Sequence, residues 1–200
     1  AYPYIYVPDS GSGTLTVVDA ATHTIVRTVS NLVGAYGVTV NHNGSRIYVT
    51  EGTNGKVVVL GQAQIDNPNQ NPLIGTFSGL GDPVAVAVSP DGRRLFVADA
   101  RNDQAIEIYM PTLTLAGTYA AAGPGLSTFA LDPAGRRLAQ ASGSGNSDTV
   151  RLYTLDSGNH IDFTLPSAPT AMTFSSDGAT LWIATAGGLV AYNPVTGNRT

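Results

Sequence analysis

The stretch Ser89-Pro90-Asp91-Gly92-Arg93-Arg94-Leu95-Phe96-Val97-Ala98-Asp99 decides the fold of this chain. Asp91-Gly92 is typical of a tight turn, because glycine tolerates positive φ and aspartate hydrogen-bonds its own backbone. Leu95-Phe96-Val97 suits a half-buried pleated strand. The pattern recurs at 41–50, 132–140 and 175–184, and a fifth copy at 4–7 has lost its turn. The turn glycines are 48, 43 and 43 residues apart, and a period in the forties predicts a radial β-repeat.

Each period holds several short runs with alternating or β-branched residues, separated by Gly, Pro, Asn and Asp, and these runs predict strands. We name the strand before each Gly turn A, the strand after it B, and the next two C and D. No stretch has a sustained apolar period of 3.6 residues, so essentially no helix is expected. The expected strands are 4–7, 14–19 and 24–29; 36–40, 47–50, 56–60 and 73–77; 84–89, 95–98, 105–109 and 114–119; 127–131, 138–141, 149–154 and 161–165; 170–174, 181–184 and 189–192.

The starts of the B strands resemble the repeats of the YVTN-family β-propeller proteins. This resemblance implies an all-β fold, a β-propeller of four-stranded antiparallel blades with about five blades represented, in a single domain over residues 1–200. It is specific for the fold and weak for function, because the same repeat serves many functions. The fourth copy has Ala139-Gln140 where an aromatic residue and Val are expected, which predicts looser packing there. The matching segments are Tyr6-Val7-Pro8-Asp9, Tyr48-Val49-Thr50-Glu51, Phe96-Val97-Ala98-Asp99 and Trp182-Ile183-Ala184-Thr185.

The first and last blades are incomplete in this strand count. The first has no A strand, and the last has no D strand. Propellers protect their edges by closing a ring, and an open edge invites pairing with another chain. Three arrangements are compatible with the count: an arc of a larger propeller, commonly seven-bladed in this family; a five-bladed ring with two three-stranded blades; or blades completed by neighbouring chains. We favour the arc.

The composition excludes several classes of function. Charged residues are 12% of the chain and the net charge is −4, which does not support nucleic-acid binding. There is no cysteine, so a disulfide framework and a thiolate metal site are excluded. No apolar run approaches the length of about 18 residues that a membrane span needs. A single lysine, Lys56, is typical of exported proteins, and we expect an extracellular or periplasmic location.

Antiparallel order sorts the loops of each blade between its two ends. The A–B and C–D turns share one end, which carries five arginines and His42, and we interpret these arginines as bridges to the carboxylates of neighbouring turns. The B–C and D–A loops share the other end, which is acidic. We expect the acidic end to be the binding face, with these site residues: Asp9, Glu51, Asp82, Asp99, Arg101, Asp103 and Asp148.

No catalytic residues, metal ligands or cofactors are assigned from the sequence. Oxygen ligands alternate in Asp99–Asp103, as a hard cation prefers, but the Gly and distal Glu of a dedicated calcium loop are missing. The three histidines at 23, 42 and 160 are expected as isolated residues in turns of one end. Glu107 alternates outward in its strand and is expected to be solvated.

These observations favour a non-catalytic, exported β-propeller scaffold that binds a protein or a cell-surface glycan. The first alternative is an enzyme or enzyme subunit, since lactonases and periplasmic amine dehydrogenases contain propellers similar to this repeat. Their sites bring together His, Arg and Glu, whereas the loops of the acidic end carry no His. The second alternative is a structural subunit of a larger or polymeric assembly, which self-associates through the incomplete blades.

Overall fold

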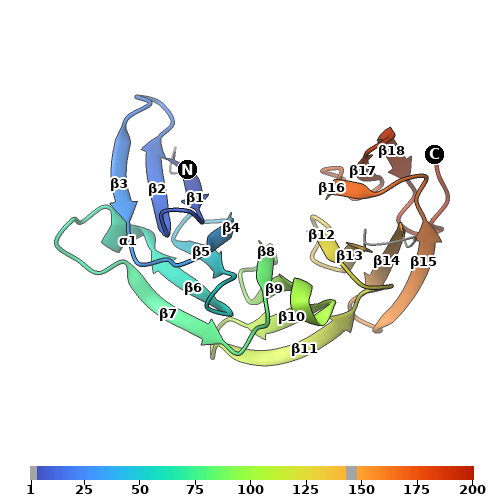
Figure 1. Ribbon diagram of the computed structural model, residues 1–200, viewed down its shortest axis with the longest axis horizontal. Helices are drawn as coiled ribbons and strands as arrows, with labels where there is room; N and C mark the ends of the chain where they lie inside the picture. Colours follow the sequence, from blue (N-terminus) through green and yellow to red (C-terminus); the bar gives the residue numbers. More distant parts are fainter. Residues whose placement is uncertain (1–3, 143–147) are drawn as a thin grey trace. The chain divides into compact units, whose positions relative to one another are not determined.

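The chain is built from five antiparallel sheets, as the computed structural model of residues 4–142 and 148–200 shows (Figure 1). Strands make up 56% of the chain and helices 4%. Every expected strand is present, and the all-β propeller fold is confirmed. Three sheets have four strands, whereas the first and last have three. We call the sheets blades I to V in chain order.

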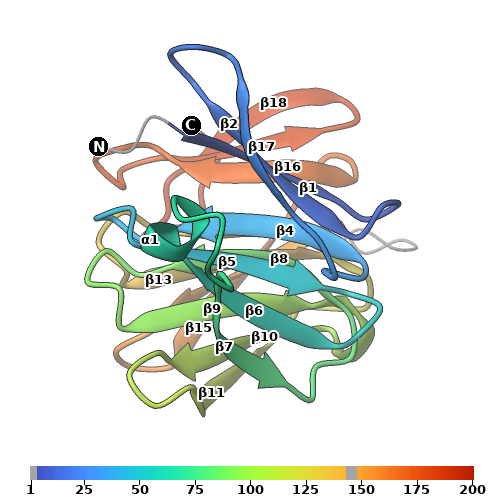
Figure 2. The same ribbon diagram turned by 90° about the vertical axis from the view of Figure 1, so that its left-hand side faces the viewer.

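The strand bounds follow the repeat. The three-stranded blades are blade I, with β1 (Tyr4–Asp9), β2 (Thr14–Asp19) and β3 (Ile25–Val29), and blade V, with β16 (Pro169–Phe174), β17 (Leu181–Thr185) and β18 (Gly188–Tyr192). Blade II contains β4 (Ala35–Val40), β5 (Arg46–Glu51), β6 (Lys56–Gly61) and β7 (Leu73–Ser78), and blade III contains β8 (Pro83–Val88), β9 (Arg94–Asp99), β10 (Gln104–Tyr109) and β11 (Thr114–Ala120). Blade IV contains β12 (Leu126–Leu131), β13 (Arg137–Ser142), β14 (Thr149–Thr154) and β15 (Asn159–Thr164). Figure 2 shows the order β4-β5-β6-β7 in blade II.

The long C–D connection of blade II holds a short helix that the sequence pattern did not predict, α1 (Gln62–Ile65). Four residues are too few for an apolar period to be visible. The helix lies beside β3 of blade I (Figure 1), and the helix and the loop after it bind Arg27 of that strand. The Arg27 guanidinium donates to the carbonyl oxygens of Gln64 at 2.6 Å, Asn67 at 2.9 Å and Gln70 at 2.9 Å. The extra residues of blade II therefore fasten the outer strand of blade I.

The described residues divide into two compact units, and the division passes through blade III. The first unit contains the residues up to Val97 together with Ile108–Leu115, and the second contains Ala98–Glu107 and Ala116–Thr200. The first unit has a core in which Leu15 and Val17 of blade I pack with Ile47 and Val49 of blade II. The core of the second unit packs blade IV against blade V through the following buried residues: Ala139, Ala141, Val150, Leu152, Phe174, Leu181, Ile183 and Tyr192.

The recurrent aromatic position of strand B differs in exposure from blade to blade. Tyr48 and Phe96 are fully buried, whereas Trp182 is 39% exposed. Ala139, which occupies this position in blade IV, is also fully buried and belongs to the core between blades IV and V. Its neighbour Gln140 is buried as well, and its Nε2 donates to the carbonyl of Tyr119 at 3.0 Å.

The expectation that Glu107 is solvated was wrong. Its side chain is 8% exposed, and its Oε2 accepts a hydrogen bond from the Tyr119 hydroxyl at 2.6 Å. The alternation rule assigns one face of a strand to water, but both faces of a propeller blade are covered by neighbouring blades. Gly117 of β11 lies beside this carboxylate, since a Cβ there would be in ordinary van der Waals contact with Oε2, at 3.6 Å.

Candidate functional site

The B–C and D–A loops of the first unit meet at one end of its sheets, because antiparallel strands return their loops alternately to the two ends. Backbone hydrogen bonds join these loops. The Leu32 N–H donates to the carbonyl of Gly13 at 2.9 Å, and the Gly52 N–H donates to the carbonyl of Gly34 at 3.1 Å. Asp9, Glu51 and Asp82 belong to this end, which we call the loop end.

A carboxylate at the end of strand B closes the B–C turn in blades I, II and III. In each case the donor lies three residues further along the chain. The Ser12 hydroxyl donates to Asp9 at 2.8 Å, and the side-chain amides of Asn54 and Asn102 donate to Glu51 and Asp99, each at 2.7 Å. The acidic residues are therefore part of the loop structure. Sequence reasoning missed their partners, although the spacing of an acid and a Ser or Asn at i+3 was visible in all three copies.

The three carboxylates differ in their exposure to solvent. Asp9 is exposed, and its hydrogen bond from the Ser12 hydroxyl, followed by those from the N–H groups of Ser12 and Gly11, lowers its pKa below the ordinary value. Glu51 is fully buried, and Asp99 is 1% exposed. A buried carboxylate can hold a loop in place, but it offers little surface to a ligand.

Glu51 also forms an ion pair with the single lysine. The Lys56 Nζ lies 3.2 Å from Oε2 of Glu51, which accepts from Asn54 as well. The other oxygen, Oε1, is buried and has no hydrogen-bond partner among the described residues. Asp82 lies next to this turn, since a Cβ at Gly52 would be 2.8 Å from Oδ1 of Asp82. The structure thus brings Glu51 and Asp82 to the same turn.

In the second unit, Asp99, Arg101 and Asp103 share one turn, which includes the 3-10 helix η1 (Ala100–Asn102). Asp103 has a left-handed backbone with φ of 48°. Its Oδ1 accepts from the N–H groups of Gly125 at 2.7 Å and Leu126 at 3.2 Å, so it ties this turn to the next D–A loop. Arg101 is exposed.

Asp148 lies just before β14, and its backbone carbonyl accepts from the Leu165 N–H at 2.6 Å. Its side chain is partly exposed. Asp148 therefore stands beside the D–A loop of blade IV, on a different segment from the turn that holds Asp99 and Asp103.

Two exposed apolar residues at the loop end of the first unit were not singled out from the sequence. Val33 is 49% exposed and Tyr36 is 65% exposed. Val33 lies within the turn that the hydrogen bond from the Ala35 N–H to the carbonyl of Leu32 closes at 2.9 Å, and Tyr36 directly follows this turn. Exposed tyrosines are common at protein interfaces, because the ring supplies apolar area and the hydroxyl a polar contact. Periodicity does not distinguish Tyr36 from a core residue.

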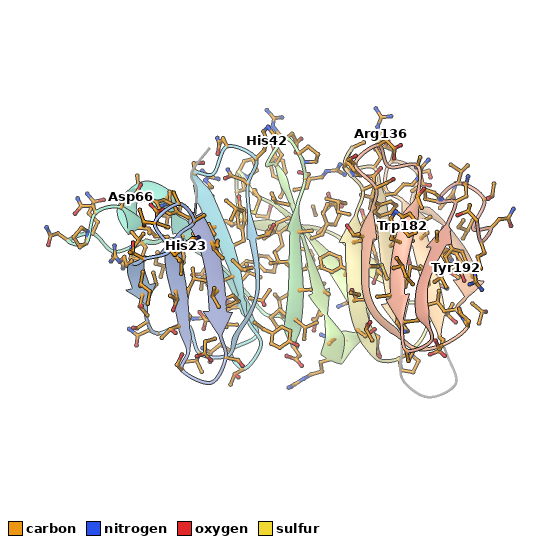
Figure 3. The ribbon with its side chains drawn as sticks, turned by 90° about the horizontal axis from the view of Figure 1, so that it is seen from above. His23, His42, Asp66, Arg136, Trp182 and Tyr192 are labelled. Atoms are coloured by element: carbon orange, nitrogen blue, oxygen red, sulfur yellow. The ribbon has the colours of Figure 1, made fainter. Side chains whose placement is uncertain are left out.

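The opposite end of the sheets contains the A–B and C–D turns. His42 projects from the A–B turn of blade II, and Arg136 projects from that of blade IV (Figure 3). Carboxylates here also serve their own segments: Asp19 accepts from the N–H groups of Ala21 and Thr22, and Asp66 accepts from Gln62. The expected bridges between the arginines and these two carboxylates are not among the described interactions.

Within the described residues, no group of three or more His, Asp and Glu side chains lies close enough to hold a metal ion. No helix in that part of the chain is both long enough and apolar enough to span a bilayer. The Asp99–Asp103 turn directs its carboxylates to Asn102, Gly125 and Leu126, so these oxygens already have donors.

The arrangement of the sheets defines a β-propeller protein. No family model matches the sequence, and no curated protein matches it. One solved structure that resembles it is hydrazine synthase from Kuenenia stuttgartiensis, a propeller-containing protein, with a TM-score of 0.74 and 14% sequence identity. The similarity covers 96% of this chain and 73% of that chain. At this identity the likeness concerns the fold alone.

Proposed function

We propose that this chain is a non-catalytic β-propeller scaffold whose loop end binds a protein or cell-surface partner. The observation that carries the proposal is the set of closed B–C turns. A loop that is rigid before binding loses less conformational entropy when a partner docks. The carboxylates of Asp9, Glu51 and Asp99 supply this rigidity, and the contacts come from the residues around them.

Tyr36 and Val33 supply the apolar contact in this proposal. Binding energy concentrates in aromatic anchors that become fully desolvated, whereas charges at the rim mainly steer the encounter. Tyr36 is 65% exposed and available as such an anchor. Asp82 is the rim residue of the first unit, and Arg101, Asp103 and Asp148 are charged residues of the corresponding loops of the second unit.

We infer in addition that the chain is a single propeller domain of the YVTN type and acts outside the cytoplasm. The B-strand starts quoted above support the YVTN type, and the continuous repeat supports a single domain. The scarcity of charged residues, 12% of the chain with one lysine, supports export.

Site-specific photo-crosslinking tests the proposed function. A benzophenone amino acid replaces Tyr36 in one variant and Tyr109 in a control, since Tyr109 is 39% exposed at the opposite end of its sheet. Each variant is irradiated with intact source cells and with their exported proteins. We expect a defined crosslinked product at position 36 and none at position 109. Equal labelling at both positions, or no product at position 36, would contradict the proposal.

An enzymatic role is the second candidate, because the structural neighbour is named a synthase. Under this proposal, Arg101 and the partly exposed carboxylate of Asp103, which share one turn of the second unit, would contact a small substrate. A screen for turnover of lactones, compared with an Arg101→Gln variant, tests it. Turnover that depends on Arg101 would favour the enzyme over the scaffold, and absence of turnover would remove this candidate.

A further inference from the structure

A hollow lies at the A–B turn end of the second unit, between the turns of blades IV and V. Its volume is about 570 Å³, within the range of small-ligand and peptide pockets. Arg136 and Arg137 line it from the A–B turn of blade IV, and Asp156 lines it from the C–D turn. The turn at Ser176–Gly178 forms the side contributed by blade V.

Hydrogen bonds hold the backbone of the two arginines in place, while their guanidinium groups form no ion pair with a described residue. Oδ1 of Asp132, which is 5% exposed, accepts from the N–H groups of Arg136 at 2.6 Å and Arg137 at 2.9 Å. Neither guanidinium has an ion pair or hydrogen bond to any described residue. Arg151 differs from them, because its Nε donates to Oδ1 of Asp162 at 2.8 Å and its Nη2 donates to Oδ2 at 2.7 Å.

The carboxylates around the hollow are mostly occupied. Asp132 serves its own turn, and Oδ1 of Asp177 accepts from the Ser175 hydroxyl at 2.6 Å and the Ala179 N–H at 2.9 Å. Asp156 is exposed, and its carboxylate has no partner among the described residues. A ligand in the hollow therefore meets two uncommitted guanidinium groups and one uncommitted carboxylate.

A second, smaller hollow of about 120 Å³ adjoins the first, and Arg137 and Thr154 line both. Its apolar side comes from Leu152, Ile161 and Val195 with Pro194, and its polar side includes Asn159 and His160. Val195 is 66% exposed and Ile161 is 37% exposed, so this apolar surface is open to a ligand.

We propose that the two hollows together bind an acidic peptide segment of a partner protein. An Asp or Glu carboxylate of the peptide pairs with Arg136 and Arg137, since guanidinium groups hold carboxylates with paired hydrogen bonds. A neighbouring apolar side chain enters the small hollow, and a peptide N–H donates to Asp156. This site is independent of the proposed function, because A–B and C–D turns of the second unit form it, whereas the proposed function rests on B–C and D–A loops.

Other ligand classes fit this surface less well. A polyphosphate or a nucleic acid carries several negative charges and depends on an excess of positive charge, so the three aspartates that line the large hollow oppose it more than they oppose the single carboxylate of a peptide side chain. A saccharide usually stacks on an exposed aromatic ring. Of the described residues lining the hollows, His160 carries the one aromatic ring, and that ring packs against Tyr153 at 5.1 Å.

A panel of synthetic peptides tests the proposal by fluorescence anisotropy. The probes are labelled hexapeptides, blocked at both ends, in which one Glu or Asp is followed at the next or second position by Leu, Ile or Val. A matched panel carries Gln or Asn in place of the acid. We expect peptides of the acidic panel to bind at least about tenfold more tightly than their amide counterparts.

The repeat provides a matched control for the arginines. Arg93 in Gly92-Arg93-Arg94 occupies the repeat position that Arg136 occupies in Gly135-Arg136-Arg137, and it lines neither hollow. We expect Arg136→Gln and Val195→Asp each to weaken peptide binding at least about tenfold, and Arg93→Gln to change it less than about twofold. Circular dichroism confirms that the variants fold.

Three outcomes would overturn the proposal: equal binding of the acidic and amide panels, equal effects of Arg136→Gln and Arg93→Gln, or binding of polygalacturonate with no peptide binding. None of these outcomes bears on the loop end. Crosslinking at position 36 reports on the proposed function separately, so the failure of one does not imply the failure of the other.

Discussion

The side-chain amide of Asn102 donates a hydrogen bond to Oδ2 of Asp99, three residues earlier in the chain, over 2.7 Å. Asn54 makes the same contact with Glu51. Both acids are buried at the end of strand B, so each carboxylate holds a turn in shape inside the protein. Some of the acidic residues at the ends of the B strands thus serve the structure of the repeat itself, because they hold its turns in shape.

Removal of the buried acid should destabilise the fold. Glu51→Ala leaves the Asn54 amide and the Lys56 ammonium without their acceptor, and a lost buried partner costs about 1–3 kcal/mol. Asp9→Ala removes an exposed carboxylate and should have a smaller effect. Urea denaturation of both variants measures the difference. A loss of stability in Asp9→Ala that equals or exceeds that in Glu51→Ala would refute this role.

Truncation to Ala at the recurrent aromatic position of strand B should cost more stability where the side chain is buried than where it is exposed. Phe96 is fully buried, and truncation of a buried Phe to Ala costs about 3–5 kcal/mol. Trp182 is 39% exposed, so Trp182→Ala should cost clearly less than Phe96→Ala. Thermal and urea unfolding of the two variants compare them. Similar losses in both would mean that Trp182 is covered in solution.

Placing an aromatic residue at the recurrent position of strand B in blade IV should destabilise the fold. Ala139 is fully buried in the core that includes Leu181 and Ile183, so Ala139→Phe inserts a ring into a core that has packed around a methyl group. Overpacking typically costs about 1–3 kcal/mol. The free energy of unfolding measures this cost, with Trp182→Phe as the conservative control. A stabilised Ala139→Phe variant would show instead that blade IV is underpacked.

Two turn glycines should respond differently to the same substitution. Gly55 and Gly92 have positive φ values of 57° and 69°, so Ala brings the left-handed strain of roughly 1–2 kcal/mol at either position. At Gly55 the added Cβ would also lie 2.2 Å from the carbonyl oxygen of Leu80, whereas at Gly92 nothing lies within 4 Å. Gly55→Ala should therefore be much more destabilising. Equal urea midpoints would contradict this explanation.

The pairing of Arg151 with Asp162 should make stability depend on pH. The hydrogen bond from Arg151 lowers the pKa of Asp162 below its ordinary value of 3.8. A lowered native pKa gives a contribution that is complete above the unfolded value and disappears as the pH falls through the native value. Asp162→Asn should thus be less stable than the parent above pH 4, and the difference should vanish in stronger acid. A constant difference across this pH range would exclude the linkage.

The fold could be predicted from the sequence because the information is local and repeated. Each Asp-Gly or Asn-Gly turn fixes where strand B begins, and four further copies correct a misjudged strand in any single one. The helix at Gln62–Ile65 escaped prediction, because it occurs once and its four residues make only about one turn, too few for an apolar period to repeat. Glu107 was misassigned because strand alternation does not reveal that a propeller blade is covered on both faces.

The candidate site was harder to predict because it depends on contacts between loops. The sequence shows an acid at the end of strand B, but not whether the carboxylate faces a partner or the side chain three residues away. Tyr36 looks like its buried relatives until the D–A loop is placed beside Gly52. The hollow beside Arg136 and Arg137 depends on the spacing between the turns of blades IV and V, which no motif encodes.

The hydrogen bonds from Arg27 to the carbonyl groups of Gln64, Asn67 and Gln70 limit how the blades of such a chain can be exchanged. Repeats of similar length are often regarded as interchangeable modules. Blade I, however, is fastened by residues that belong to the C–D connection of blade II, and shortening that connection to the length found in blade III would remove the carbonyl cage. Blades I and II would therefore have to be duplicated or transferred to another protein together, as one unit of two blades.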